Sequence, residues 1–352
     1  MDFIDCIKLL AQFTSDHEKE NLWDHIIFDD GCIYAQGPKG GALCQASESQ
    51  GITLAVPAKN LLKALQAIGS SGIKMARTKD FKLQLKGPEG SAQIEGLELQ
   101  EFPIFPAPSK KIKWIPVQGL DQVARYSWCA SADKTRLHLT GIHFSPQGYL
   151  EVSDGHALIR QYLKSPIPHL PDIILPPILF ADVPETAFLG VEDDRCYLAP
   201  QPPISAGYRV ASIIRGPYPD ITPLLDAPKS LPAIGVDRAQ FIQLLRRVKM
   251  SYHEVLLVRP AASQQLQLQV PKKRTERLFD FEASLDFRDM NAHPGPTGKI
   301  MCNAKILEAL LSSATEPEAK LHIAFHDAGG LDPLLIEESH FLAVLMPMRL
   351  YD

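Results

Sequence analysis

The sequence predicts an α+β protein built from three tandem, similar units, each with two helices packed on antiparallel sheets. Three observations support this prediction: a length of 352 residues, amphipathic helix patterns that recur along the chain, and strand patterns between them. A chain of this length is long for one domain and suits two or three. Hydrophobic residues make up 45% and charged residues 22% of the chain, which is ordinary globular composition.

A first set of helix patterns repeats along the chain. Residues 2–13, 119–130 and 237–250 carry apolar side chains at or near the i, i+3, i+4, i+7 spacing that forms one buried stripe on a helix. Their starts lie about one third of the chain apart, which is the length of a small domain. The repeat therefore predicts one such helix at the start of each unit.

A second set of helix patterns supports the repeat. Residues 61–65 and 306–310 have similar sequences and lie about two repeat lengths apart. The middle copy is expected near residues 174–188, where prolines at both ends leave room only for a short or distorted helix.

Strand patterns fill the space between the helices. Residues 138–144, 265–270 and 321–325 alternate with the period of two that places one face of a strand in a core. The run 341–346 is apolar throughout and predicts a fully buried strand. Helices together with antiparallel strands in each unit define the α+β class.

Proline-rich stretches at 102–108 and 217–232 are plausible unit boundaries. The sequence thus predicts three domains, residues 1–110, 111–230 and 231–352.

The N-terminal sequence has no basic region before a long apolar core, and no apolar stretch approaches the roughly 20 residues of a membrane span. We therefore expect a soluble, intracellular protein with no membrane partner. The net charge of −5 argues against a protein that grips nucleic acid tightly over its whole surface. It permits weak contact through a local basic surface.

Candidate sites for chemistry are weak. Asp154 and His156 could form an acid–base pair of a hydrolase, but Asp154-Gly155 is a turn dipeptide and no nucleophile elbow accompanies it. His322 and His326 have a helical metal-ligand spacing within a strand-like segment, so two ordinary histidines are favoured. No two of the six cysteines have CxxC spacing, and there is no Walker loop or dinucleotide fingerprint. The sequence predicts no enzyme activity, no metal site and no cofactor.

Basic residues recur on the predicted helices, on faces mostly opposite the apolar stripes. Repetition in similar units favours a shared positive surface that meets phosphates without reading bases. The residues assigned to this surface are Lys8, Lys59, Lys63, Arg125, Arg136, Arg246, Arg247, Lys249 and Lys305.

Several motifs together resemble the bacterial sliding clamp, the β subunit of DNA polymerase III. Ser153-Asp154-Gly155-His156-Ala157-Leu158 is similar to that family's Thr-Asp-Gly-His-Arg-Leu, and Arg136 with Leu139-Thr140-Gly141 resembles the strand before it. Tyr218-Pro219-Asp220 and Glu101-Phe102-Pro103 resemble its Phe-Pro motifs, and Met346-Pro347-Met348-Arg349-Leu350 matches its C-terminus. The order of these motifs holds over essentially the whole chain.

The resemblance implies the three-domain DNA clamp fold, arranged as a head-to-tail homodimer that forms a pseudo-sixfold ring. Duplex DNA would pass through the hole without sequence recognition. A clamp-loader ATPase would open the ring, and the ring would tether the replicative DNA polymerase and other partners. The expected location is the cytoplasm of a bacterial cell, or of a host cell if the clamp is virus-encoded.

The resemblance also implies site residues. Partners would insert a short motif with Leu and Phe into a hydrophobic pocket, where Met side chains adapt to varied ligands. The expected pocket residues are Leu139, Ser153, Gly155, His156, Leu158, Pro219, Leu224, Val344, Met346, Pro347, Met348 and Arg349. Candidates for the ring seam, between the first domain and the third domain of a second copy, are Ile94, Val248 and Met250.

The chain departs from the family pattern in four places. Ala157 and Pro223 stand where basic residues are usual, Tyr351-Asp352 extends past the usual terminal Leu, and the second helix of the middle unit has no Lys or Arg. These departures indicate a specialised or virus-encoded clamp with altered partner preference. The alternatives are a clamp-fold peptide-binding scaffold that does not load on DNA, and a hydrolase that uses Asp154 and His156.

Overall fold

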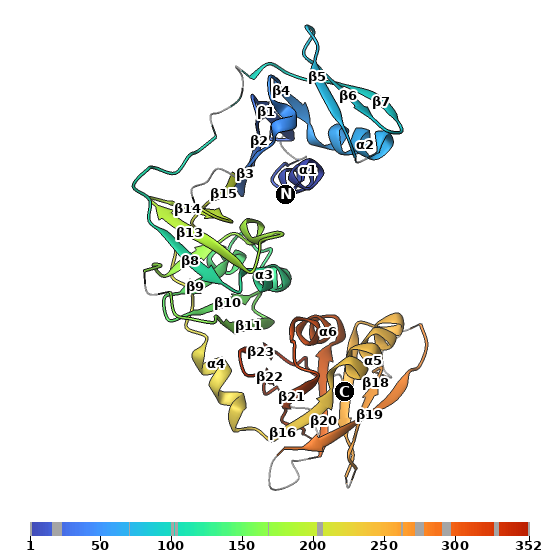
Figure 1. Ribbon diagram of the computed structural model, residues 1–352. Helices are drawn as coiled ribbons and strands as arrows, with labels where there is room; N and C mark the ends of the chain where they lie inside the picture. Colours follow the sequence, from blue (N-terminus) through green and yellow to red (C-terminus); the bar gives the residue numbers. More distant parts are fainter. Residues whose placement is uncertain are drawn as a thin grey trace. The chain divides into compact units, whose positions relative to one another are not determined.

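The computed structural model describes residues 2–15, 23–69, 71–99, 102, 105–167, 169–202, 207–261, 263–271, 278–290, 297–326 and 331–350 (Figure 1). The chain divides into two compact units. The first comprises Met1–Ala124 and Ile167–Arg215, and the second comprises Arg125–Pro166 and Gly216–Asp352. The predicted boundaries at 110 and 230 remain a prediction.

The first unit contains antiparallel sheets and, among its described residues, two helices of nine residues or more besides shorter helical segments. Among its described residues, eight strands follow the order β4-β1-β2-β3-β15-β14-β13-β8, and three more form a separate sheet, β5-β6-β7. The strands are β1 (His25–Asp29), β2 (Cys32–Gly37), β3 (Gly40–Gln45), β4 (Thr53–Pro57), β5 (Lys74–Arg77), β6 (Lys82–Gly87), β7 (Gly90–Glu95), β8 (Trp114–Gln118), β13 (Thr186–Glu192), β14 (Arg195–Ala199) and β15 (Gly207–Ser212). A short strand, β12 (Ile173–Leu175), also belongs to this unit.

The two longer helices of the first unit are α1 (Phe3–Ala11) and α2 (Ala58–Ile68). Asp2 caps α1 because its side chain accepts a hydrogen bond from the Asp5 amide (2.8 Å). The stripe that predicted α1 is buried, with Ile7 and Leu10 fully inaccessible, and it packs in one core with the buried face of α2. Both helices, predicted at 2–13 and around 61–65, are confirmed.

In the second unit the strands follow the order β9-β10-β11-β23-β22-β21-β16-β19-β18-β17-β20, with antiparallel neighbours. They are β9 (Ile142–Ser145), β10 (Tyr149–Ser153), β11 (Ala157–Tyr162), β16 (Ala233–Asp237), β17 (Glu254–Arg259), β18 (Gln265–Gln269), β19 (Glu282–Asp289), β20 (Gly298–Asn303), β21 (Glu318–His322), β22 (Leu334–Glu337) and β23 (Phe341–Leu345). All five residues of β23 are buried, as predicted for the apolar run 341–346, but Met346 at the end of that run lies beyond the strand and is exposed.

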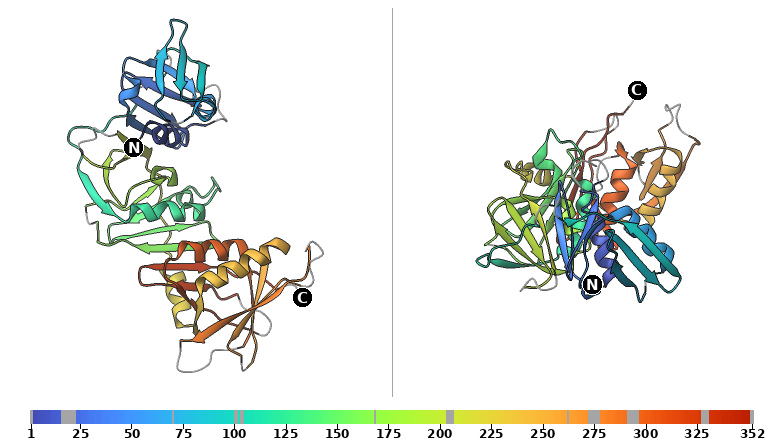
Figure 2. Two further views of the ribbon diagram at one scale, coloured as in Figure 1. Left: turned by 45° about the vertical axis from the view of Figure 1, so that its right-hand side comes forward. Right: turned by 90° about the horizontal axis from the view of Figure 1, so that it is seen from above.

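Helices α5 (Arg238–Ser251) and α6 (Ala304–Ser313) lie side by side in the second unit (Figure 2). Asp237 caps α5 by accepting from the Gln240 amide, and Asn303 caps α6 by accepting from the amides of residues 305 and 306. The helices predicted at 237–250 and 306–310 are confirmed. None of the helices in the described ranges is both long and apolar enough to cross a membrane.

The helix predicted at 119–130 is largely wrong. Only α3 (Leu120–Val123) is α-helical, and the chain continues as a 3-10 helix, η4 (Ala124–Cys129). Leu120, Val123, Tyr126 and Cys129 are all buried, and they recur at a spacing of three. A 3-10 helix has three residues per turn, so η4 aligns Tyr126 and Cys129 on one face.

Two strand predictions also need correction. The first part of the strand predicted at 138–144 lies in a 3-10 turn, η5 (Leu137–Thr140), and only β9 is a strand. The Thr140 hydroxyl donates to the Leu137 carbonyl (2.7 Å), which closes this turn locally. Within 321–325, the strand ends at His322. The run 265–270 is confirmed as β18, and the short middle helix is the 3-10 turn η6 (Pro177–Phe180).

Candidate functional site

The motif at 153–158 and the C-terminal run lie side by side in the second unit. Strand β11 pairs with β10 on one side and with β23 on the other, in a register that places Leu158 opposite Val344. Beyond the last strand pair, the Met346 amide donates to the His156 carbonyl (2.9 Å). Two segments that are far apart in the sequence therefore lie side by side at one end of these strands.

A tight turn shapes the motif. The Asp154 carboxylate accepts from the amides of His156 and Ala157, both at 2.8 Å, and the Ser153 hydroxyl donates to the Ala157 carbonyl (2.7 Å). Gly155 has φ +93°, and a Cβ there would lie 2.7 Å from Nη1 of Arg136, so the turn requires glycine. The Asp154 carboxylate is used to hold the turn, which favours a structural role over a catalytic one.

A short helix, α4 (Thr222–Asp226), packs against β23, and the 3-10 turn η7 (Ala227–Ser230) follows it. The Asp220 carboxylate accepts from the Thr222 amide (3.0 Å) at the start of α4. Leu225 is fully buried and packs with Leu158 and Val344. Its neighbour Leu224 is 45% exposed, so α4 contributes one side chain to the core and one to the surface.

Three exposed apolar side chains lie on segments that adjoin the 153–158 turn, and we call them the apolar rim: Leu137 (57% exposed), Leu224 (45%) and Met346 (36%). Leu137 was missed from the sequence, because its 3-10 turn was predicted as a strand. Its place beside the turn follows from its neighbour Arg136, whose Nη2 donates to the Asp154 carbonyl (3.3 Å).

The structure brings some of the expected pocket residues together, since Leu158 packs with Val344 and the Met346 amide donates to the His156 carbonyl. Leu139, Ser153, Leu158 and Val344 are buried, whereas Gly155, His156, Pro219, Leu224, Met346 and Arg349 are exposed, and Pro347 and Met348 are half-buried. Met348 is a partial exception, because its amide donates to the Met301 carbonyl (2.8 Å) of β20. Tyr351 and Asp352 lie outside the described residues, as do Glu101 and Pro103.

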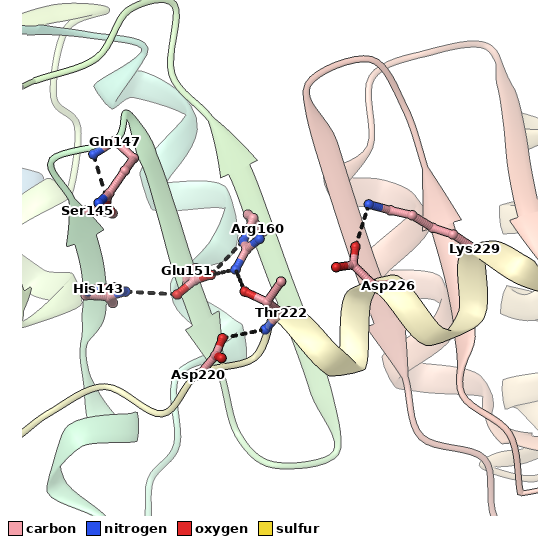
Figure 3. Close-up of polar contacts among 9 residues, drawn as sticks. All are labelled: His143, Ser145, Gln147, Glu151, Arg160, Asp220, Thr222, Asp226 and Lys229. Carbon is pink, nitrogen blue, oxygen red and sulfur yellow. Dashed lines mark hydrogen bonds and ion pairs between the residues drawn. The ribbon is translucent and has the colours of Figure 1, made fainter.

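A buried charged network lies behind α4 (Figure 3). Glu151 on β10 faces Arg160 on β11, and its Oε1 accepts from the guanidinium Nε at 2.6 Å. The other carboxylate oxygen lies 2.9 Å from His143 Nδ1. Arg160 Nη2 also donates to the Thr222 hydroxyl (3.1 Å), so the network reaches α4. This network is not predictable from the sequence, because neither strand pattern fixes which residues face each other.

Burial and charge act in opposite directions on this network. Burial alone would lower the pKa of Arg160, but the charge of Glu151 and the hydrogen bonds to it outweigh burial and raise that pKa. The Tyr218 ring stacks on His143, with centroids 4.7 Å apart and planes at 12°. Burial, together with the Glu151 charge, raises the pKa of Tyr218, so its phenol stays neutral.

Most of the basic residues predicted to share one surface are exposed, and two of them pair with a carboxylate. The side chains of Lys8, Lys59, Lys63, Arg125, Arg247 and Lys305 are exposed. Glu308 on α6 accepts from Arg246 (2.8 Å) and binds Lys249. Burial of Glu308 is outweighed by these two cations, which lower the pKa of its carboxyl group. Only part of the α5 charge therefore remains available to phosphates.

Arg136 differs from the other residues assigned to the basic surface, because it lies on neither an α-helix nor a 3-10 helix. Its Nε binds the Asp133 carboxylate (3.1 Å), and its guanidinium packs over Gly155. Arg136 therefore lies beside the 153–158 turn, and its DNA-facing role remains a prediction.

The residues predicted at the ring seam differ in exposure. Ile94 is 5% exposed and Val248 is inaccessible, because both side chains belong to the core of a single chain. Met250 is 67% exposed, and Leu278 (78%) and Phe279 (44%) near it were not predicted. The Phe279 amide donates to the Ser251 hydroxyl (3.2 Å), which holds these residues at the end of α5.

The histidine pair and the cysteines form no joint site. His322 binds Glu337 (2.8 Å), and His326 binds Asp332 (2.8 Å). Cys32 is half-buried and the other five cysteines are buried. Across the described ranges, no three His, Cys, Asp or Glu side chains are grouped so that they could hold a metal ion.

Comparisons by sequence find no match, either among protein-family models or among curated proteins. Solved structures do match, each over 99% of this chain and 97% of the other. The DNA polymerase III β subunit of Thermotoga maritima has a TM-score of 0.79 at 16% identity. The sliding clamp of Bartonella birtlesii bound to griselimycin has 0.79 at 15%, and the β clamp of Helicobacter pylori bound to a DNA ligase peptide has 0.75 at 17%. The predicted α+β clamp architecture is confirmed: over its whole length, the chain has the fold of the bacterial DNA polymerase III β sliding clamp.

Proposed function

We propose that this protein is a DNA sliding clamp, a binding scaffold without catalytic activity that encircles duplex DNA and tethers a replicative DNA polymerase. The observation that carries the proposal is the clamp fold over the full chain together with the exposed apolar rim around the 153–158 turn. The Helicobacter pylori clamp of the same fold holds a DNA ligase peptide. This supports a peptide as the ligand of the rim.

In this proposal the ring is a head-to-tail homodimer of three-domain chains, with domains at 1–110, 111–230 and 231–352. The exposed Met250, Leu278 and Phe279 are the apolar contribution to the seam. A clamp-loader ATPase opens the ring at a primer end. Its place of action is the cytoplasm, where bacterial replication occurs.

Enclosure replaces tight binding as the source of DNA retention. A ring keeps DNA at a high effective concentration without strong contacts, so a few exposed lysines and arginines are sufficient. This suits a chain with a net charge of −5. It also suits the pairing of Arg246 and Lys249 with Glu308, which would weaken a surface that had to grip DNA.

The same ion pairs favour one alternative, a clamp-fold peptide-binding scaffold that does not load on DNA. A scaffold has no need for a positive lining. Both functions use the apolar rim, so they differ only in DNA loading.

Peptide binding tests the proposal at the rim. A fluorescein-labelled peptide carrying the Leu and Phe motif of a replicative polymerase should bind the wild-type protein. We expect Leu224→Ala and Met346→Ala each to weaken binding by about tenfold, because each removes apolar surface that a peptide would bury. Fluorescence anisotropy measures the affinities.

Leu97→Ala is the matched control, because Leu97 is as exposed as Met346 (36%) and lies in the other unit. It should bind the peptide like the wild type. Unchanged affinity in both rim variants would contradict the proposed site.

A further inference from the structure

The charged network behind α4 lies in an environment that normally excludes charge. Glu151 is 2% exposed, Arg160 8% and His143 6%. A buried ion pair recovers by attraction roughly what it loses by desolvation, so it adds little stability over apolar residues of the same size. Its geometry is more informative than its energy. The guanidinium Nε donates to Glu151 Oε1, Nη2 forms an ion pair with the same oxygen, and the guanidinium lies over the Tyr149 ring (4.5 Å), so Arg160 is held in one orientation.

Helix α4 depends on its neighbours for its position. It has five residues, which is too short for a helix to be stable alone. The Leu224 and Leu225 amides both donate to the Ile221 carbonyl, at 3.0 and 3.2 Å. Two attachments connect α4 to the sheet. Leu225 packs among Leu158 and Val344, and the Thr222 hydroxyl accepts from Arg160 (3.1 Å).

The Thr222 hydroxyl also connects Arg160 to the start of α4. It hydrogen-bonds the Asp220 carboxylate, and that carboxylate accepts from the Thr222 amide. These two bonds, with the nearby charge of Arg160, lower the pKa of Asp220. A continuous chain of contacts therefore runs from Glu151 through Arg160 and Thr222 to the first turn of the helix that carries Leu224.

We propose that Arg160 is a positioning residue for the partner surface: held by Glu151, it fixes the first turn of α4 through the Thr222 hydroxyl and thereby places Leu224 for a peptide ligand. This inference rests on the proposed peptide-binding function. It assigns no contact between Arg160 and the peptide. Its consequence is that removing the hydrogen bond between Arg160 and the Thr222 hydroxyl weakens peptide binding, although neither residue need touch the peptide.

The test replaces Thr222, because variants of Glu151 or Arg160 leave a buried charge unpaired. Thr222→Val keeps the shape and removes the hydroxyl, whereas Thr222→Ser keeps the hydroxyl. We expect Thr222→Val to weaken binding of the labelled polymerase peptide by about tenfold, the usual effect of losing a hydrogen bond to a charged group. Thr222→Ser should bind within about twofold of the wild type.

A cycle with Arg160→Lys identifies the bond responsible. Lysine keeps the positive charge beside Glu151 but lacks the guanidinium group, whose nitrogens bond to Glu151 and Thr222 at the same time. If both variants act through one bond, the double variant binds no more weakly than the weaker single variant. Independent, additive losses, or wild-type affinity in Thr222→Val, would overturn the proposal.

Hydrogen exchange separates this inference from the proposed function. The amides of Leu224 and Leu225 should exchange several-fold faster in Thr222→Val than in Thr222→Ser, without any peptide present. A wild-type protein that binds no peptide would refute the proposed function, while this exchange difference would still test the role of Arg160. Equal exchange in the two variants would refute that role even if the peptide binds.

Discussion

Replacing Glu151 by glutamine is expected to lower the free energy of unfolding by about 3–5 kcal/mol, because it leaves the buried Arg160 guanidinium without its counter-charge. His143 loses its charged partner in the same change. Urea denaturation followed by circular dichroism measures the loss. An effect below about 1 kcal/mol would show that the network is not as enclosed as the geometry indicates.

The double variant Glu151→Met/Arg160→Met is the matched control. It removes both charges and fills the space with apolar side chains, so its stability should return to within about 1–2 kcal/mol of the wild type. A double variant as unstable as the single one would attribute the loss to packing and not to the unpaired charge.

Replacing Gly207 by alanine is expected to cost more than about 3 kcal/mol. Gly207 has φ +116°, and a Cβ there would lie 2.3 Å from the Leu43 carbonyl oxygen and 3.0 Å from the Cys44 Cα. Both atoms belong to the backbone of β3, so no side-chain rotation relieves the clash. Gly207 opens β15, whose pairing with β3 joins strands of the predicted first and middle domains. Thermal unfolding, together with the urea curve, measures the effect.

Gly51→Ala separates strain from clash. Gly51 also has a positive φ, +76°, but nothing lies within 4 Å of its would-be Cβ. This variant should lose only about 1–2 kcal/mol of stability, the usual cost of a left-handed backbone conformation in an L-residue. Equal losses in the two variants would mean that β15 moves away from β3 without penalty.

Local signals were sufficient for the four long helices. A stripe with a period of 3.6 and, in α1 and α5, an aspartate cap are contained within about a dozen residues. The α-helix predicted at 119–130 was wrong for the same reason. Over about a dozen residues, apolar side chains spaced by three, as in a 3-10 helix, resemble apolar side chains spaced by three or four, as in an α-helix. Only the alignment of Val123, Tyr126 and Cys129 in the folded core distinguishes them.

The parts of the site that are short sequence motifs could be predicted. The parts that depend on which residues of two paired strands face each other could not. The resemblance related Ser153–Leu158 to the C-terminal run, and the β11–β23 register is the physical basis for their proximity. The facing of Glu151 and Arg160 depends on the register of a hairpin, which alternation alone does not set. The burial of Ile94 and Val248 was not predictable either, because their positions in the sequence do not reveal which face of the strand or helix is covered.

Loading onto circular DNA distinguishes a protein that encloses DNA from one that binds its surface. The protein is loaded with its matched clamp loader and ATP onto nicked circular DNA, separated from free protein, and the circle is then cut once. We predict that the protein stays on the intact circle at moderate salt and is lost after linearisation, since it slides off the ends. Retention that is the same before and after cutting, or no retention by a protein that binds the polymerase peptide, would show that the protein does not enclose DNA.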